Sequence, residues 1–375
     1  MKRKIIHIVL TGGPCGGKTT LLTFLRQKLE EKGYIVIIVP ESATLSINAG
    51  VSPINSLIGG DVAQKAITSL GYYIENVFRQ AASEVPGEQD VVIIYDRGIT
   101  DSSAYASPEL YESILAGLGL HPVQVRDERY KNGVIHLVTA AEGAEEHYTR
   151  ANNTARYETP EMARVQDRKT RDVWMGHPHW RMVDNSTDFQ GKIYRAYREV
   201  MTIIGVPPVE YEKKYIISFD RKDLPDHCQR IDIEQFYPMS KDPNVIPRFR
   251  KRGQHGFYSF YRTTKELIGE GKNIEIEDFT TEARYEASRE FIRPDTELVR
   301  KIRTCFEYAG QYFELDEFED PRVKEIIGGA AQLELEITDS EKKITLPSWV
   351  KGAKEVTGQP AFTNFRIAQA LARKS

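Results

Sequence analysis

The chain has 375 residues, of which 40% are hydrophobic and 28% are charged, and its formal net charge is −3. This length exceeds one ordinary hydrophobic core, so we expect two domains, and the balanced charge gives no reason to expect a specific nucleic-acid partner. The three cysteines have no spacing typical of disulfides or metal sites, and no apolar run reaches the length of a membrane span. We therefore expect a cytoplasmic protein, and peripheral membrane contact stays open.

The first motif is a phosphate loop, G-x-x-x-x-G-K-[ST], which residues 12–19 match. An apolar run over 5–10 predicts a buried parallel strand before it, and a helical pattern follows over 20–32. Glycines let the backbone curl so that its N–H groups face phosphate oxygens, and the helix N-terminus adds a favourable dipole. Lys18 would pair with the β- and γ-phosphates, and the Thr19 hydroxyl would ligate Mg²⁺. The predicted nucleoside triphosphate site comprises Gly12, Gly13, Gly16, Gly17, Lys18, Thr19 and Thr20.

Apolar runs alternate with helical stretches as far as residue 205, which predicts a parallel sheet with crossover helices. Ligands bind outside the carboxyl ends of the strands in such sheets. Glu41 and Asp96 each follow an apolar run at that edge, so both could face the phosphate loop. We expect Asp96 to be catalytic and to hold the Mg²⁺ shell, whereas Glu41 is either a substrate contact or a solvated loop residue. The expected strands are 34–39, 91–95, 134–138 and 180–183, and the expected helices are 61–82, a stretch around 145–146, and 189–203.

The turn Asp96-Arg97-Gly98 and an Arg-rich segment downstream resemble nucleoside and nucleotide kinases among P-loop proteins. Small phosphoryl-transfer enzymes close a basic lid over the transferring phosphate, because guanidinium groups match its charge. Arg97, Arg150 and Arg156 are therefore candidate nucleotide-binding residues. The later arginines, from 164 to 171, fit a charged amphipathic helix at least equally well.

A rigid break at Pro207-Pro208 predicts a boundary between domains 1–205 and 206–375. Beyond it, charged residues alternate along several predicted strands, beginning with Glu210, Glu212 and Lys214 over 209–217. Taken singly, each strand fits a sheet whose charged face meets water. Taken together, the faces would line the polar cavity of a closed antiparallel barrel, with carboxylates for a divalent metal and cations for polyphosphate. The other charged strands are 247–250, 257–265, 281–288, 299–304, 313–316 and 333–337.

The ordered set over 209–365 resembles the CYTH, or triphosphate tunnel metalloenzyme, superfamily, whose E-x-E-x-K signature matches Glu210, Glu212 and Lys214. The resemblance implies an antiparallel tunnel with these three as catalytic residues. The residues implied to hold Mg²⁺ or Mn²⁺ are Glu210, Glu212, Asp316, Glu334 and Glu336. Those implied to bind triphosphate are Lys214, Arg248, Arg250, Lys265, Lys301 and Arg303, with Glu282 and Arg284 as further wall residues.

A P-loop α/β domain followed by a CYTH-like α+β barrel resembles the TRPL translocation defect protein family, which is implied to bind GTP and phosphoinositides in membrane trafficking. The chain lacks the coiled coil and membrane tail expected of the plant fusions of a uridine-kinase-like domain with such a tunnel. Three functions stay open: a metal-dependent phosphohydrolase, a phosphoinositide-binding module regulated by GTP or ATP, and a kinase for a nucleoside-like acceptor. No Asn-Lys-x-Asp guanine signature is present, so the choice between ATP and GTP is also open.

Overall fold

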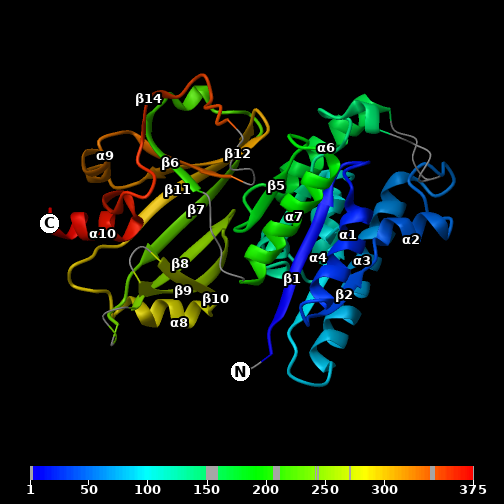
Figure 1. Cartoon of the computed structure of the whole chain (residues 1–375), viewed down its shortest axis with the longest axis horizontal. Helices are drawn as coiled ribbons and strands as arrows, with labels where there is room; N and C mark the ends of the chain where they lie inside the picture. The colour runs from blue at the N-terminus through cyan, green and yellow to red at the C-terminus, as the bar shows by residue number, and fades with distance from the viewer. Residues whose placement is uncertain are drawn as a thin grey trace. The chain divides into compact units, whose positions relative to one another are not determined.

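The computed structural model describes residues 3–148, 159–205, 212–240, 242, 245–269, 272–337 and 343–374, with the backbone alone at 265–269, 272–276 and 336. These residues form two compact units, each with its own sheet (Figure 1). The predicted boundary at 205/206 borders residues outside the described ranges, so its exact position stays a prediction. Among the described helices, none combines the length and the apolar character needed to cross a membrane.

The first unit is built on a five-stranded parallel sheet with the order β2-β3-β1-β4-β5. This arrangement confirms the predicted α/β class, and β1 lies at the centre of the sheet. The helix expected around residues 145–146 is instead a short 3₁₀ turn. The elements are β1 (Ile5–Gly12), α1 (Lys18–Glu30), β2 (Ile35–Val39), α2 (Ser42–Asn48), α3 (Gly60–Glu84), β3 (Val91–Asp96), η1 (Ile99–Ala104), α4 (Pro108–Gly117), α5 (Pro122–Gln124), η2 (Val125–Arg129), β4 (Gly133–Leu137), η3 (Glu145–His147), α6 (Pro160–Trp174), β5 (Trp180–Val183) and α7 (Phe189–Ile204).

The two sides of β1 differ in character. Ile6, Ile8 and Leu10 join an apolar core with residues of α1 and α7, where burial stabilises each large side chain by about 1.5–3 kcal/mol. Two residues on the other side of β1 make polar contacts: His7 Nδ1 lies 2.8 Å from the Tyr95 hydroxyl oxygen, and the Thr11 hydroxyl donates to Asp101 of η1. The strand therefore carries polar contacts up to the point where the phosphate loop begins.

The second unit holds a nine-stranded sheet with the order β10-β9-β8-β7-β11-β12-β13-β6-β14. All its ladders are antiparallel, which confirms the predicted antiparallel β-rich domain. Between the edge strands β10 and β14 the described residues show no ladder. The elements are β6 (Glu212–Ser218), η4 (Arg221–Asp223), β7 (Gln229–Phe236), β8 (Val245–Gln254), β9 (Phe257–Gly269), β10 (Lys272–Phe279), α8 (Glu282–Arg289), β11 (Val299–Tyr308), β12 (Gln311–Phe318), α9 (Arg322–Ile327), β13 (Ala331–Glu336), β14 (Lys351–Glu355), η5 (Pro360–Phe362) and α10 (Asn364–Arg373).

The prediction of a strand over 281–288 was wrong, because this segment is helix α8. Thr281 caps the helix, and its side chain accepts a hydrogen bond from the Arg284 backbone N–H at 3.2 Å. Tyr285 is buried against aromatic residues of β7, β8 and β9, whereas Glu282 and Arg284 are exposed. The alternation of charges therefore follows the outer side of a helix, and neither Glu282 nor Arg284 is a wall residue of the sheet.

Candidate nucleotide and polyanion sites

The phosphate loop connects the centre of the first sheet to the N-terminus of α1. Gly12 and Gly17 have φ of 135° and 94°, which are left-handed conformations that L side chains rarely adopt. A Cβ atom on Gly12 would also lie 2.1 Å from the backbone oxygen of Leu137 in β4. The close approach of β4 and the backbone turn thus both require glycine at position 12. The nucleotide-site residues predicted between Gly12 and Thr20 lie in the segment from the end of β1 to the first turn of α1.

Lys18 folds back over this loop. Its Nζ donates to the backbone oxygens of Gly12 at 3.2 Å and Gly13 at 3.3 Å. The pKa of Lys18 is lowered to about 8, mainly by burial and then by the nearby Arg97, while Asp96 and Glu41 oppose the shift. The ammonium is held by carbonyl oxygens, which a phosphate oxygen can replace with a stronger charge-assisted bond.

Asp96 ends β3 directly beside Leu10 of β1, at the same edge of the sheet as the loop. Its Oδ1 is buried and has no hydrogen-bond partner in the described part of the chain. Burial raises the pKa of Asp96, and Lys18 partly offsets that rise. A buried carboxylate oxygen without a partner beside the loop fits a ligand of Mg²⁺, as does the exposed Thr19 hydroxyl at the start of α1.

Glu41 and Arg97 form an ion pair at this edge, with Nε and Oε1 separated by 2.7 Å. The Thr44 hydroxyl donates to the other oxygen of Glu41 at 2.6 Å. Burial would raise the pKa of Glu41, but Arg97 and Lys18 outweigh it and keep the carboxylate ionised. Arg97 also pairs with Asp101 at 3.3 Å, a residue that sequence reasoning missed although it lies only four positions downstream.

The predicted lid arginines, Arg150 and Arg156, lie outside the described residues. The later arginines of this segment lie in α6, where Arg164 donates to the Ala141 backbone oxygen at 2.6 Å. Arg171 is buried and donates to Asp167 at 2.9 Å and to Glu142 at 3.2 Å. These two arginines therefore bind other parts of the protein around the loop.

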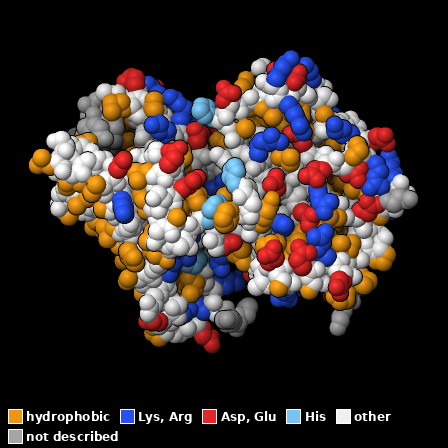
Figure 2. Space-filling model, turned by 180° about the vertical axis from the view of Figure 1, so that it is seen from behind, with side chains coloured by type: hydrophobic (Ala, Val, Ile, Leu, Met, Phe, Trp, Pro, Cys, Tyr) orange, Lys and Arg blue, Asp and Glu red, His pale blue; other side chains and the backbone are white. Residues whose placement is uncertain are grey.

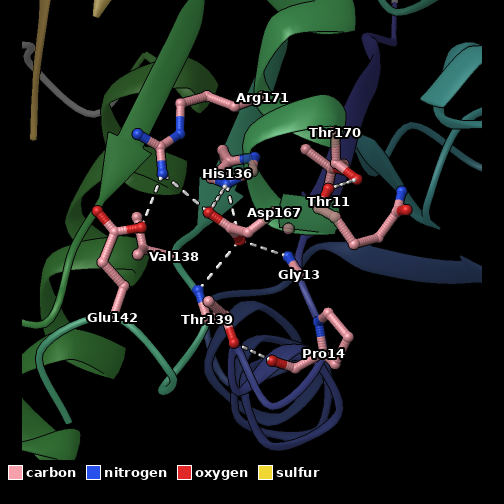
Figure 3. A network of polar contacts seen from close by, with 12 residues as sticks. Thr11, Gly13, Pro14, His136, Val138, Thr139, Glu142, Asp167, Thr170 and Arg171 are labelled. Atoms are coloured by element: carbon pink, nitrogen blue, oxygen red, sulfur yellow. Dashed lines mark hydrogen bonds and ion pairs between the residues drawn. The ribbon is translucent and has the colours of Figure 1, made fainter. Parts of the chain in front are cut away.

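A buried polar network under the loop was not predicted (Figure 3). Asp167 of α6 accepts hydrogen bonds from the backbone N–H groups of Gly13 at 2.7 Å and Thr139 at 3.1 Å. His136 of β4 also contacts this carboxylate, with Nε2 3.2 Å from Oδ1. No short motif joins these residues, since they come from segments far apart in the sequence.

The second unit gathers its predicted charged residues on one side of the sheet, which we call the charged face. Paired residues in a ladder point to the same side. In the ladders, Arg250 pairs with Gln235, which in turn pairs with Val299. Arg303 pairs with Asp316. Glu314 pairs with Glu334, which in turn pairs with Lys214. Together with the period of two along each strand, this register places the following on the charged face: Glu212, Lys214, Arg248, Arg250, Lys301, Arg303, Asp316 and Glu334.

Most of the charged face is turned away from water, although the Glu212 side chain is 39% exposed. Asp316 and Lys301 have side-chain exposures of 0% and 1%, and Arg303 has 14%. A charged face of an ordinary exposed sheet would be mostly solvated, so this burial supports an inward orientation. The molecular surface instead shows acidic and basic side chains interspersed over the side in view (Figure 2).

Half of the charged face is a continuous chain of ion pairs, which we call the paired cluster. Arg303 donates to Asp316 through Nε and Nη2, each at 2.7 Å, to Glu334 at 2.7 Å, and also to Glu314. Lys214 contacts Glu334 at 2.7 Å and Glu212 at 3.2 Å. Lys301 donates to Asp316. The cluster comprises four carboxylates, Glu212, Glu314, Asp316 and Glu334, and three cations, Lys214, Lys301 and Arg303.

The protonation of the paired cluster follows from these contacts. Burial would raise the pKa of Glu334, but Lys214 and Arg303 hold it well below its usual range. The pKa of Glu212 is raised, first by burial and then by the neighbouring Glu334. Burial lowers the pKa of Lys301 to about 8, against the opposing charge of Asp316. Arg303 and Lys301 likewise lower the pKa of Asp316, so Asp316 and Glu334 are ionised and already neutralised by their cations.

The other half of the charged face is richer in arginine, and we call it the arginine column. Arg248, Arg250 and Arg252 occupy alternate positions of β8. Glu277 of β10 lies 3.3 Å from Arg248 and 3.9 Å from Arg250. The Thr263 hydroxyl donates to Glu277 at 2.7 Å, which fixes that carboxylate. The guanidinium groups of Arg248 and Arg250 thus lie beside the same carboxylate.

The metal site that the resemblance implied in the second unit stays a prediction, because the side chains of Glu210 and Glu336 lie outside the described ones. No cluster of three or more His, Cys, Asp or Glu side chains is arranged to hold a metal ion in the described ranges. Asp316 and Glu334 are engaged by lysine and arginine instead. Glu210 lies outside the described residues, and Glu336 and Lys265 are described only by their ladder positions opposite Glu212 and Ile246.

Comparison with known proteins supports the assignment of the first unit. Residues 7–192 match the family model described as an AAA domain, so the first unit is a P-loop NTPase-like domain. No curated protein matches the chain.

Three solved structures show a limited likeness to the chain. The hypothetical protein NE1496 is 21% identical, covering 43% of this chain and 98% of that chain with a TM-score of 0.33. The inorganic triphosphatase NE1496 is 20% identical, covering 43% and 95% with a TM-score of 0.32. The PH1012 protein from Pyrococcus horikoshii OT3 is 20% identical, covering 35% and 80% with a TM-score of 0.24. TM-scores this low carry no argument about function.

Proposed function

We propose that the protein binds a nucleoside triphosphate with Mg²⁺ in its first unit and a triphosphate or similar polyanion on the charged face of its second unit. The observation that carries the first part is the buried Oδ1 of Asp96 beside the phosphate loop, which has no hydrogen-bond partner among the described residues. Lys18 supplies the cation and Asp96 the metal-directed anion at one edge of the sheet. An ordinary glycine-rich turn would need neither group.

In this proposal the residues of the loop act by binding and orienting. The backbone N–H groups of the loop and of the first turn of α1 hold phosphate oxygens. Lys18 exchanges the backbone oxygens of Gly12 and Gly13 for phosphate oxygens. Thr19 and Asp96 would hold Mg²⁺, which when bound neutralises phosphate charge and orients the phosphate chain.

The arginine column supports the second part. Guanidinium groups match phosphate geometry with paired N–H donors, and β8 carries three of them at alternate positions, Arg248, Arg250 and Arg252. Lys301 and Arg303 each contact Asp316. In this proposal the polyanion binds at Arg248 and Arg250 of β8.

Calorimetry with the full chain tests both parts. ATP, GTP and tripolyphosphate are titrated with and without Mg²⁺ into the wild-type protein and the variants Lys18→Ala and Arg250→Ala. Lys18→Ala should weaken nucleotide binding about a hundredfold and leave tripolyphosphate binding at the second unit, whereas Arg250→Ala should weaken tripolyphosphate binding about tenfold and leave nucleotide binding unchanged. A wild-type protein that binds none of the three ligands would refute the proposal.

A second candidate is phosphoryl transfer from the bound nucleotide to a small acceptor. The ion pair of Glu41 with Arg97 favours it, because it places an ionised carboxylate at the carboxyl edge of the sheet near Lys18. Phosphate release from ATP or GTP that increases severalfold with a nucleoside-like acceptor would support transfer. Release that is insensitive to every acceptor would support hydrolysis or a nucleotide switch.

The resemblance to the TRPL translocation defect protein family adds phosphoinositide headgroups to the polyanions that the arginine column could bind. Vesicle flotation with and without phosphoinositides separates a headgroup from free tripolyphosphate. Recruitment that is lost in Arg250→Ala would support a membrane role, and recruitment that depends on nucleotide and is lost in Lys18→Ala would support regulation by the first unit.

A further inference from the structure

The backbone of the phosphate loop is held from below by one carboxylate, that of Asp167. The side chain of Asp167 is fully buried on α6. Its Oδ1 accepts from Gly13 N–H at 2.7 Å and from Thr139 N–H at 3.1 Å, so a single atom joins the loop to the end of β4 (Figure 3). The Gly13 N–H is therefore satisfied by the protein and is not directed at phosphate.

Two further contacts join the same parts of the chain. The Thr139 hydroxyl donates to the backbone oxygen of Pro14, and the Ala140 N–H donates to the backbone oxygen of Cys15 at 3.3 Å. Three successive loop residues, 13 to 15, are thus each held by a polar contact from outside the loop. The chain of the loop is fixed up to the residue before Gly16.

The fit between Asp167 and the loop depends on glycine at position 13. A Cβ atom there would lie 2.6 Å from Asp167 Oδ1 and 2.8 Å from its Cβ. Any larger residue would push the carboxylate away from the backbone. This close approach explains why Gly13, which is not a fixed position of the phosphate-loop pattern, is glycine in this chain.

Two neighbours keep Asp167 ionised. Arg171 donates to Oδ2 at 2.9 Å, and His136 Nε2 lies 3.2 Å from Oδ1. Burial would raise the pKa of Asp167, but His136 and Arg171 lower it well below its usual range. An ionised carboxylate only accepts hydrogen bonds, so it cannot turn a donor toward the Gly13 N–H.

From this geometry we infer that Asp167 is a positioning residue for nucleotide binding, which sets the conformation of the phosphate loop through Gly13 before phosphate arrives. The inference rests on the proposed nucleotide function of the first unit. A loop that is already ordered loses less conformational entropy on binding and therefore binds more tightly.

The test compares Asp167→Asn with Asp127→Asn. An asparagine at 167 must direct its NH₂ either at the backbone N–H groups or at Arg171 and His136, so donors face donors in both orientations. Asp127 is an equally buried carboxylate of the same unit, paired with Arg126 at 2.7 Å. Both variants remove a buried carboxylate charge, but of the two residues only Asp167 has a described contact with the phosphate loop.

We expect Asp167→Asn to weaken Mg–ATP binding at least about tenfold and to speed amide hydrogen exchange of residues 13–18 in the nucleotide-free protein. Asp127→Asn should lower Tm and leave both quantities within about twofold of wild type. If Asp167→Asn does not fold, the pair Thr139→Val and Thr139→Ser replaces it. Valine loses the hydroxyl that donates to Pro14, and should weaken ATP binding severalfold, whereas serine keeps the hydroxyl and should restore it.

The outcomes separate this inference from the proposed function. Wild-type protein that binds no nucleotide refutes the proposed function and removes the premise of the inference. If the wild-type protein binds ATP, and Asp167→Asn has the same affinity and the same amide exchange rates, the inference is refuted and the proposed function stands. Equal losses of affinity in Asp167→Asn and Asp127→Asn would also refute it, because they would reflect stability and not position.

Discussion

The two candidate sites of this protein prepare for an anion in opposite ways. The phosphate loop is built from backbone, and its charged groups lie at its rim, with one carboxylate oxygen of Asp96 left without a partner. The charged face is built from side chains, and in the paired cluster the cations and carboxylates neutralise one another. The loop can therefore keep its shape when a side chain at its rim, such as that of Lys18, is lost, whereas the paired cluster depends on every member for its own stability.

Removal of Arg303 should have the largest effect and tests the dependence of the paired cluster on its members. Arg303→Met leaves Asp316, Glu314 and Glu334 without their shared guanidinium. Breaking a buried pair by removing one partner costs about 3–5 kcal/mol, which urea unfolding of the full chain would measure for the second unit.

Arg300→Met is the matched control, because Arg300 lies on the same strand, is exposed, and pairs with Glu234 at 2.7 Å. An exposed pair contributes about 1 kcal/mol or less to the free energy of unfolding. Equal losses in the two variants would show that the paired cluster is solvated, and would contradict the inward orientation of the charged face.

Removal of Lys18 tests the opposite expectation for the loop. Lys18→Ala deletes the cation and leaves the backbone cradle, so we expect Mg–ATP to bind about a hundredfold more weakly with little change in stability. Lys28→Ala, on an exposed part of the same helix α1, should leave binding unchanged. Retained affinity in Lys18→Ala would place the nucleotide elsewhere.

The arginine column should respond like the loop and not like the paired cluster. Arg250→Ala removes a cation that lies 3.9 Å from Glu277, a carboxylate that also contacts Arg248. We expect tripolyphosphate to bind about tenfold more weakly, with a small effect on unfolding. Arg262→Ala is the control, because Arg262 is exposed and lies on the opposite side of the sheet from the charged face. Equal effects of the two substitutions would argue against binding on the charged face.

The sequence predicted what depends on neighbouring residues and missed what depends on distant ones. The phosphate loop and the common face of the charged residues were predictable, because one is a short motif and the other follows from the period of two in a strand. The alternation over 281–288 misled, since Thr281 and the single buried Tyr285 suit a capped helix equally well.

Partner choice was beyond the sequence. Asp167 reaches Gly13 across 154 positions, and no local pattern points to that contact. The side of the sheet on which Asp316 and Glu334 lie was predicted correctly, but their ion pairs with Arg303 depend on the packing of three strands. A carboxylate that pairs with an arginine and one that binds a metal can lie on the same side of a strand, so the period of two does not distinguish them.

The pH dependence of binding gives the smallest effect and the sharpest contrast between the sites. Phosphate binds the protonated form of Lys18, whose pKa in the free protein is about 8 because of burial and the nearby Arg97. A bound polyanion raises this pKa, so binding above pH 8 requires proton uptake, and affinity should fall with rising pH by at most about tenfold per unit. The guanidinium groups of Arg248 and Arg250 stay charged throughout this range, so their contribution should not change.

Calorimetry between about pH 7.5 and 9.5, in buffers of different ionisation enthalpy, measures the proton uptake directly. A flat affinity without proton uptake would mean that Lys18 does not meet the phosphate chain, and that the loop, like the arginine column, relies on groups that do not titrate.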